Sequence, residues 1–268
     1  MLLLAVSYKA DIHQYSRREK NALLQSAAYY GKAWFVKYLI NQGLDVNYKN
    51  KKGENALFAS VNPFHSNIET IQCLLDNGAN KADLFKTYDG KIILENLMYS
   101  STNVTDKKRE VFKFLISLGV DINAKNKNGY TLIIQCAEFG SSEMFNEIIE
   151  SGANVEDHLG NVLHRIEYRM RDKGSKKHTV EEAFEKLKIL YNKKFPVTVL
   201  DYYNHNKYDI LTEYADSIKN RKAIKKYEEN IILELLEMGF KHRHPKKFLE
   251  YLERTNNESI KKQLERDT

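Results

Sequence analysis

The sequence has little cysteine, proline or tryptophan: two cysteines, three prolines and one tryptophan in 268 residues. A disulfide-stabilised scaffold needs many cysteines in a short chain, so that class is excluded. Cys73 and Cys136 both lie in apolar segments. We expect them to be buried free thiols, because buried cysteine behaves as a small hydrophobe. The few prolines and the twelve glycines leave little room for a disordered linker.

A membrane-spanning helix is not predicted. The apolar start of the chain, residues 1–6, is far shorter than the roughly 20 apolar residues that such a helix needs. It also lacks the basic segment that begins a secretory signal peptide. We therefore expect no membrane insertion, and a protein that is cytoplasmic or is secreted into a host cell.

Motifs of catalysis and metal binding are missing as well. The sequence has no G-x-S-x-G, no phosphate-binding glycine loop, no H-E-x-x-H and no pair of C-x-x-C motifs. His242-Arg243-His244 resembles a fragment of a metal site, but no cysteine or acidic pair lies near it. We expect no catalytic residue, no metal and no cofactor. One alternative stays open: an enzyme or effector whose catalytic or ligand site lies in the divergent part after residue 160.

Positive charge is concentrated in the C-terminal part. Residues 1–160 hold 18 Lys/Arg and 18 Asp/Glu, whereas residues 161–268 hold 24 and 18. The basic stretches 169–177, 193–194, 219–226 and 241–247 favour a solvated face first, an acidic protein surface second and nucleic acid third. Glutamates interleave with these lysines, and lysine lacks the bidentate fork that base and phosphate recognition uses. The bias toward Lys, Asn, Ile and Tyr is typical of an AT-rich genome, as in many intracellular bacteria and some large viruses.

The best-preserved pattern runs from Gly119 to Glu156. Gly119-Val-Asp-Ile-Asn123 recurs as Gly152-Ala-Asn-Val-Glu156, 33 residues later. A turn, a short apolar segment, a glycine break and a second amphipathic segment lie between the two phrases. A unit that returns to its starting phase after about 33 residues is one supersecondary element that stacks on its neighbours.

This stretch resembles the ankyrin repeat. The segment TLIIQCA, residues 131–137, occupies the place of the family's T-P-L-H-x-A-A, and GANV, residues 152–155, that of its G-A-D-V. The resemblance covers five to six divergent repeats and is clearest over residues 21–165. It implies an all-α fold, an ankyrin-repeat solenoid of stacked helix-turn-helix units, with irregular inter-helix insertions and a helical C-terminal cap. His164 occupies the place of the family's signature histidine, for which the resemblance implies a structural role.

The spacing of the repeats divides a single predicted domain, residues 1–268, into parts. Signature glycines fall at 43, 78, 119, 152 and 239, with Lys194 in place of the glycine expected between the last two. Their spacings of 35, 41, 33, 42 and 45 predict insertions between the two helices of a unit, at 100–108, 171–179 and 216–226. The predicted parts are an N-terminal cap or partial repeat (1–20), recognisable repeats (21–165), divergent repeats with basic insertions (166–239) and C-terminal capping helices (240–268).

The resemblance also implies where a partner binds. In ankyrin proteins the turn tips, and the two positions after the paired alanines of the first helix, face one concave surface. An aromatic residue stands at these helix positions in four of five units, and Tyr and Arg are favoured interface anchors. The predicted partner-binding residues are Tyr29, Tyr30, Tyr99, Glu138, Phe139, Tyr168 and Arg169 on helices, and Tyr48, Lys49, Lys51, Lys52, Tyr88, Lys125, Lys127 and His158 at tips.

These patterns predict a non-enzymatic module that binds one dedicated protein partner. Eroded repeats with unequal insertions favour a single partner over a general scaffold. Two settings suit such a chain: a bacterial or viral effector that engages a host protein, and an immunity or antitoxin protein that masks a toxin. The sequence does not choose between them.

Overall fold

The computed structural model is helical wherever it describes the chain. The described residues are 16–88, 90–98, 106–171, 177–197, 210–218, 225–240, 248, 250 and 259–262. Within them there is no β-strand, and the one β feature is an isolated antiparallel bridge between Tyr88 and Lys91. The predicted all-α class is confirmed. None of the described helices combines the length and the apolar character that crossing a membrane requires.

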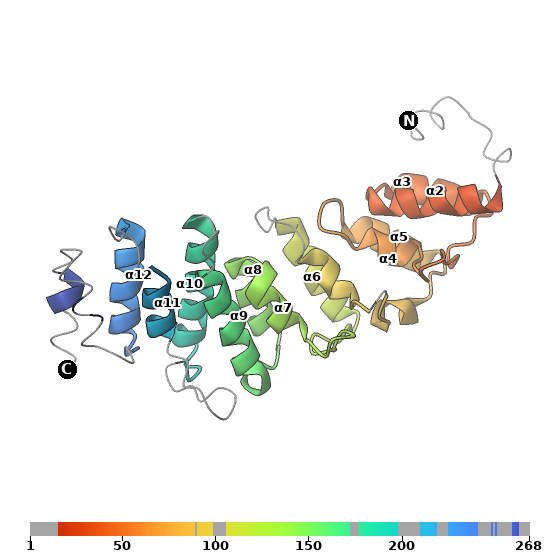
Figure 1. The fold of residues 1–268 in the computed structure, drawn as a ribbon. Coiled ribbons are helices and arrows are strands. Elements are labelled where there is room, and N and C mark those ends of the chain that lie inside the picture. Colours follow the sequence, from red (N-terminus) through yellow and green to blue (C-terminus); the bar gives the residue numbers. More distant parts are fainter. Residues whose placement is uncertain are drawn as a thin grey trace. The chain divides into compact units, whose positions relative to one another are not determined.

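The chain divides into two compact units, whose helices are labelled in Figure 1. Unit 1 comprises residues 1–135 and 150–153, and unit 2 comprises residues 136–149 and 154–268. The elements of unit 1 are α2 (Arg17–Tyr29), α3 (Ala33–Asn41), α4 (Ala56–Ser60), α5 (Ile68–Asp76), the 3₁₀ helices η2 (Lys81–Phe85) and η3 (Ile93–Leu97), and α6 (Asp106–Ser117). Helix α7 (Leu132–Phe139) begins in unit 1 and ends in unit 2, which contains α8 (Ser142–Glu150), η4 (Glu156–His158), α9 (Leu159–Arg171), α10 (Lys177–Asn192), α11 (Ile210–Ile218) and α12 (Lys226–Glu237).

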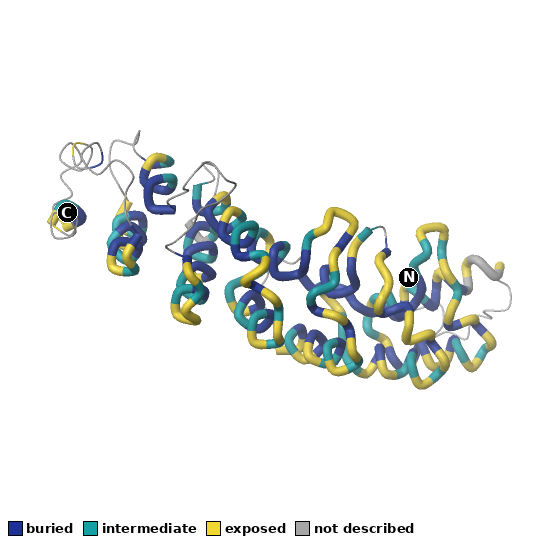
Figure 2. The backbone as a smooth tube through the Cα atoms, turned by 90° about the horizontal axis from the view of Figure 1, so that it is seen from below, coloured by how far each residue is buried: buried dark blue, intermediate teal, exposed yellow. Residues whose placement is uncertain are grey.

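Within each unit, successive helix pairs stack. In unit 1 the first helices α2 and α4 pack together, and so do the second helices α3 and α5. In unit 2, α9 packs against both its own partner α10 and the next first helix, α11. The paired alanines Ala27 and Ala28 are buried, as expected for small residues that let helices approach closely. Figure 2 shows the result along the chain, with buried backbone on the packed helices and exposed backbone at the projecting turns.

The second helices end in a repeated left-handed turn. After α3, Gly43 has a φ of 84°, and the N–H of Leu44 donates to the carbonyl of Leu39. This is the Schellman motif, for which glycine is preferred because a Cβ disfavours positive φ. Gly78, Gly119, Gly152 and Gly239 have similar positive φ values. Lys194 adopts the same conformation with a φ of 67°, so the position of the replaced glycine was predicted correctly.

Replacing Lys194 with glycine should therefore stabilise the protein. A non-glycine residue in this conformation costs about 1 kcal/mol, and the Lys194 side chain is exposed at the end of α10. We expect Lys194→Gly to raise the free energy of unfolding by about 1 kcal/mol, measured by urea denaturation with far-UV circular dichroism. Lys193→Gly is the matched control, because Lys193 has an ordinary negative φ, and it should give no gain. A loss of stability in Lys194→Gly would contradict this prediction.

The G-x-D-x-N phrase of the sequence joins neighbouring repeats. Oδ1 of Asp45 accepts the N–H of Asn47 at 2.9 Å, and the Asn47 amide donates to the carbonyl of Gly78, also at 2.9 Å. Asn47 Oδ1 in turn accepts the N–H of Asn80 at 2.7 Å. The same residues at 121 and 123 repeat the pattern, with Asn123 donating to the carbonyl of Gly152 at 3.4 Å. The G-x-D-x-N motif therefore forms a turn and also supplies the asparagine that hydrogen-bonds to the next repeat.

The described ends of two predicted insertions are helical. Helix α9 extends to Arg171 and α10 begins at Lys177, so residues 171 and 177–179 of the predicted insertion belong to helices, and the residues between them lie outside the described part. Likewise α11 reaches Ile218 and α12 begins at Lys226. In the third repeat the segment after Gly90 forms only the short 3₁₀ helix η3. Most of the 100–108 insertion, and most of the predicted closing helices after residue 240, lie outside the described residues.

Candidate partner-binding surfaces

Half-exposed aromatic side chains recur where first helices end. Tyr30 follows α2, Phe64 follows α4, Phe139 ends α7 and Tyr168 lies near the end of α9. Their exposed fractions are 49%, 63%, 49% and 50%. We call these four residues the helix-end aromatics. The sequence pattern predicted three of them but assigned Asn62 and Pro63, instead of Phe64, to the second repeat.

Phe64 is held outward by a buried asparagine. Asn62 is 5% exposed, and its Oδ1 accepts the N–H groups of Phe64 and His65 at 3.1 and 2.9 Å. Its amide donates to the carbonyls of Tyr29 and Ala59, at 2.9 and 3.2 Å. One side chain thus fixes the loop after α4 and joins it to the end of α2. A side chain fixed before binding loses less conformational entropy when a partner arrives.

The same loop forms an aromatic cluster with α2. The His65 ring lies 5.8 Å from the Tyr29 ring and 5.3 Å from the Tyr30 ring, and the two tyrosine rings meet edge to face at 5.2 Å. Gly31 is required for this approach, because a Cβ there would lie 2.4 Å from the carbonyl oxygen of His65. Tyr29 is half-buried in the cluster, so Tyr30 contributes more exposed surface than its neighbour.

In unit 2 a buried lysine braces the turn that carries Phe139. Lys186 on α10 donates from Nζ to the carbonyls of Cys136 and Ala137, at 2.9 and 3.1 Å. One helical turn away, Oε2 of Glu182 accepts the N–H of Ser142, at 2.7 Å. The cation meets the C-terminal end of α7 and the carboxylate meets the N-terminal end of α8, which are the favourable pairings with helix dipoles. Burial lowers the pKa of Lys186, while the nearby carboxylate of Glu182 opposes that effect.

Two predicted residues of unit 2 are less available than expected. Glu138 is half-buried and forms an ion pair with Arg165, with 2.5 Å between carboxylate and guanidinium. Arg169 is half-buried on α9. The exposed ring beside each of them, Phe139 or Tyr168, is the larger part of the surface offered at that position.

Turn tips project from unit 1 on asparagine hubs. Asn50 Oδ1 accepts the N–H groups of Lys52 and Glu54 at 2.9 and 3.0 Å. Asn126 repeats this arrangement two repeats later, accepting from Asn128 and Tyr130 at 2.9 and 3.1 Å. The predicted lysines Lys49, Lys51, Lys52, Lys125 and Lys127 are all exposed on these tips, and Tyr48 is half-buried beside them.

Tyr88 is a correction to the predicted surface. It is 5% exposed, with its ring 4.3 Å from that of Phe58. Burial raises the pKa of its hydroxyl well above the usual range, and the charge of Asp83 acts in the same direction. The ring fills space between the second and third repeats and is not offered to a partner. Tyr99, predicted at the end of the same repeat's first helix, lies outside the described residues.

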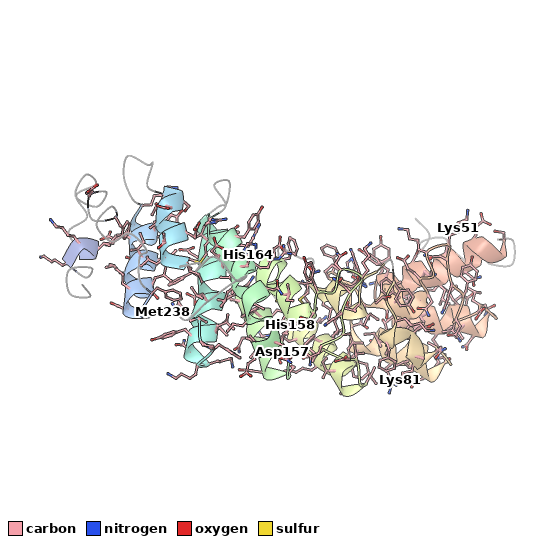
Figure 3. The ribbon with its side chains drawn as sticks, turned by 60° about the horizontal axis from the view of Figure 1, so that its bottom comes forward. Lys51, Lys81, Asp157, His158, His164 and Met238 are labelled. Atoms are coloured by element: carbon pink, nitrogen blue, oxygen red, sulfur yellow. The ribbon has the colours of Figure 1, made fainter. Side chains whose placement is uncertain are left out.

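The two histidines of the fifth repeat lie on η4 and α9, and His158 is not at the predicted turn tip. His158 was predicted at a turn tip, but it belongs to the 3₁₀ helix η4, which runs directly into α9. His164, expected to be structural, is half-exposed on α9, with Nδ1 3.7 Å from the carboxylate of Glu167 (Figure 3). Burial lowers the pKa of His164, and the nearby Arg165 and Arg171 lower it further. The fifth repeat therefore has no projecting tip at residues 157–158.

Signs of other chemistry are sparse. No group of three or more His, Cys, Asp or Glu side chains in the described part of the chain could hold a metal ion. In unit 2 an open surface groove of about 480 Å³ lies between α8 and α10, lined by Ser142, Glu143, Asn146, Glu185, Ile189, Asn192 and Lys193. Cys136 is a buried free thiol as predicted, whereas Cys73 is free but half-buried. The groove holds no recognisable pairing of nucleophile and base.

Comparison with known proteins supports the repeat assignment. The family model described as ankyrin repeats (3 copies) matches residues 1–87. A protein of Rickettsia felis, described as an ankyrin repeat protein, is 31% identical over 125 residues, which make up 46% of this chain and 53% of the relative. This chain therefore spans about half the length of that relative. The two matches confirm the resemblance inferred from the sequence.

Proposed function

We propose that this chain, which contains ankyrin repeats, binds one dedicated protein partner through the helix-end aromatics and the neighbouring turn tips. Ankyrin repeats support a role in protein–protein interaction, and that much rests on the family. The choice of surface rests on one observation. Four half-exposed aromatic rings lie at or near the ends of first helices in four repeats, two in each unit.

The energetics favour these residues as anchors. A monomer scatters exposed apolar side chains singly, whereas a series near the ends of successive first helices indicates a shared use. Tyrosine and phenylalanine bury a large area while losing only two side-chain torsions. The Asn62 loop in unit 1 and the Lys186 brace in unit 2 fix two of the anchor positions before a partner binds. Interfaces of standard size bury about 800 Å² on each partner. A few such aromatic anchors, together with the polar surface around them, can supply that area.

Removing the anchors should weaken binding without unfolding the protein. We expect Tyr30→Ala, Phe139→Ala and Tyr168→Ala each to weaken the partner's affinity by about 1–3 kcal/mol. The partner would be recovered by affinity capture from the source organism, and its affinity for each variant measured by calorimetry. Trp34→Ala is the matched control, because Trp34 is 63% exposed but lies on the second helix α3. Unchanged affinity in all three variants would contradict the proposed surface.

Two settings fit this proposal. In one, the chain is an effector that acts on a host protein inside the host cell. In the other, it is a cytoplasmic immunity or antitoxin protein that covers a toxin. The lysine- and asparagine-rich composition and the similarity to a Rickettsia felis protein support a bacterial source. A toxin encoded in an adjacent gene would favour the immunity or antitoxin setting, and a host protein as the captured partner would favour the effector setting.

A further inference from the structure

Lysines gather on the turn tips of unit 1. The three tips are residues 48–54, 86–91 and 125–130, which we call the tip edge. It contains Lys49, Lys51, Lys52, Lys86, Lys91, Lys125 and Lys127, against the acids Glu54 and Asp89. Residues 1–160 as a whole carry equal numbers of basic and acidic residues. Unit 1 by itself carries 18 basic and 13 acidic residues, so the part of the unit outside the tip edge holds 11 of each, and the tip edge accounts for the unit's excess of positive charge.

The rest of the unit has no such excess of one sign. On α6, for example, the exposed acids Asp106 and Glu110 are accompanied by the exposed lysines Lys107 and Lys113. Lys51 and Lys81, both labelled in Figure 3, lie on opposite sides of unit 1, so Lys81 is not part of the tip edge. A solvated surface gains nothing from concentrating charge of one sign in this way, whereas a face that meets a charged partner does.

Hydrogen bonds and ion pairs join the three tips into one edge. Asp83, which is 2% exposed, binds Lys49 of the first tip at 3.1 Å and Lys86 of the second at 2.7 Å. The N–H of Lys127 on the third tip donates to the carbonyl of Gly90 on the second at 2.9 Å. Burial acts to raise the pKa of Asp83, but its two lysine partners outweigh burial and hold that pKa below the usual range. Asp83 therefore stays ionised and occupies two of the seven lysines.

We propose that the tip edge binds an extended acidic segment of a protein partner. Lys51, Lys52 and Lys125 are exposed and have no ion pair with any carboxylate that the structure describes. Neighbouring repeats stack at about 10 Å, and an extended chain advances about 10 Å in three residues. Acidic side chains three residues apart would thus meet successive tips. This inference rests on the proposed protein-binding function and names the chemistry of the partner at this edge.

Nucleic acid fits the tip edge less well. The edge contains no arginine, so it lacks the bidentate donor that recognises phosphate and guanine. Its aromatic residues Tyr48 and Tyr130 are half-buried and Tyr88 is buried, so no fully exposed ring offers a platform on which bases could stack. Carboxylates spaced along a polypeptide can be bound by compact positive charges, which lysine supplies.

The test compares two probes and two variants with the same change in charge. The probes are a fluorescein-labelled oligo-glutamate peptide and a random-sequence DNA duplex. The tip variant carries Lys51→Gln, Lys52→Gln and Lys125→Gln. The control variant carries Lys37→Gln, Lys81→Gln and Lys107→Gln, three exposed lysines of unit 1 outside the edge. Far-UV circular dichroism confirms that both variants keep the fold.

We expect fluorescence anisotropy to show that the tip variant binds oligo-glutamate roughly tenfold more weakly than the unmodified chain. The control variant should stay within about twofold of the unmodified chain. Equal losses in the two variants would overturn the proposal, because they would reflect net charge alone. Tighter binding of the duplex than of the peptide, lost in the tip variant, would overturn it in favour of nucleic acid. The peptide test does not use the captured partner, so its failure would leave the test of the helix-end aromatics unaffected.

Discussion

Replacing Asn62 with alanine is expected to lower the free energy of unfolding by about 2–3 kcal/mol. The substitution deletes the acceptor of the Phe64 and His65 N–H groups and the donor to the Tyr29 carbonyl. These groups lie in a part-buried loop, where unpaired polar groups are costly. The Asn62 side chain is small, so it adds little to stability by packing. Its contribution comes from its four hydrogen bonds.

The loss should be local as well as global. Hydrogen exchange measured by mass spectrometry should rise in residues 62–67 and at the end of α2, where the Asn62 bonds converge. Partner affinity should fall too, because Phe64 and the ring cluster would no longer be fixed. Asn41→Ala is the matched control, since Asn41 is exposed at the end of α3, and it should change stability by less than about 0.5 kcal/mol. If the Asn62→Ala protein were as stable as the parent and as well protected from hydrogen exchange, the role assigned to Asn62 would be contradicted.

The sequence predicted the repeat framework because that framework depends on local rules. A left-handed residue must end each second helix, and a spacing argument finds it even where lysine stands in place of glycine, as the φ of Lys194 shows. Repeat register also located three of the four exposed aromatics at the ends of first helices, Tyr30, Phe139 and Tyr168.

Side-chain direction at the tips required the folded structure. Tyr48 and Tyr88 both belong to predicted turn tips, yet Tyr88 turns inward onto Phe58. Whether a tip aromatic is buried depends on the space between two repeats, which no single-repeat pattern reports. The Asn62 loop was missed for a related reason, because its hydrogen bonds reach back to α2 in the previous repeat.

The fifth repeat shows how spacing alone can mislead. Asp157 and Gly160 keep the spacing between hub and glycine that Asn126 and Gly129 have in the fourth repeat. The residue between them, Leu159, is apolar and buried, so the segment folds onto the core as η4 and the start of α9. The burial of one leucine therefore outweighs the turn signal.

A buried carboxylate should make the stability of unit 2 depend on pH. Glu167 on α9 has 3% of its side chain exposed, and its Oε1 lies 2.7 Å from Nε of Arg171. The other side of Arg171 meets Glu213 of α11 at 2.5 Å. Burial raises the pKa of Glu167 from its ordinary value of 4.5 to about 7; the Arg171 charge opposes this and the Glu213 charge adds to it.

The sign of the effect follows from which state holds the proton more tightly. Between pH 4.5 and 7 the folded protein retains the Glu167 proton while the unfolded chain has lost it. The associated stability is complete below pH 4.5 and is lost as the pH rises through 7. The difference between those two pKa values corresponds to at most about 3 kcal/mol, and we expect about 2 kcal/mol because charged neighbours and water can relax around the site.

The variant Glu167→Gln should remove this dependence, because glutamine keeps the shape but does not ionise. At pH 5 the variant and the parent should unfold at nearly the same urea concentration, whereas at pH 8 the variant should be more stable by about 2 kcal/mol. Far-UV circular dichroism would follow unfolding, and hydrogen exchange in α9 and α11 would locate the change. Glu143→Gln, an exposed carboxylate on α8, is the matched control and should leave the difference between pH 5 and pH 8 unaltered. If Glu167→Gln were instead less stable than the parent at pH 8, the ion pair with Arg171 would outweigh the cost of burial.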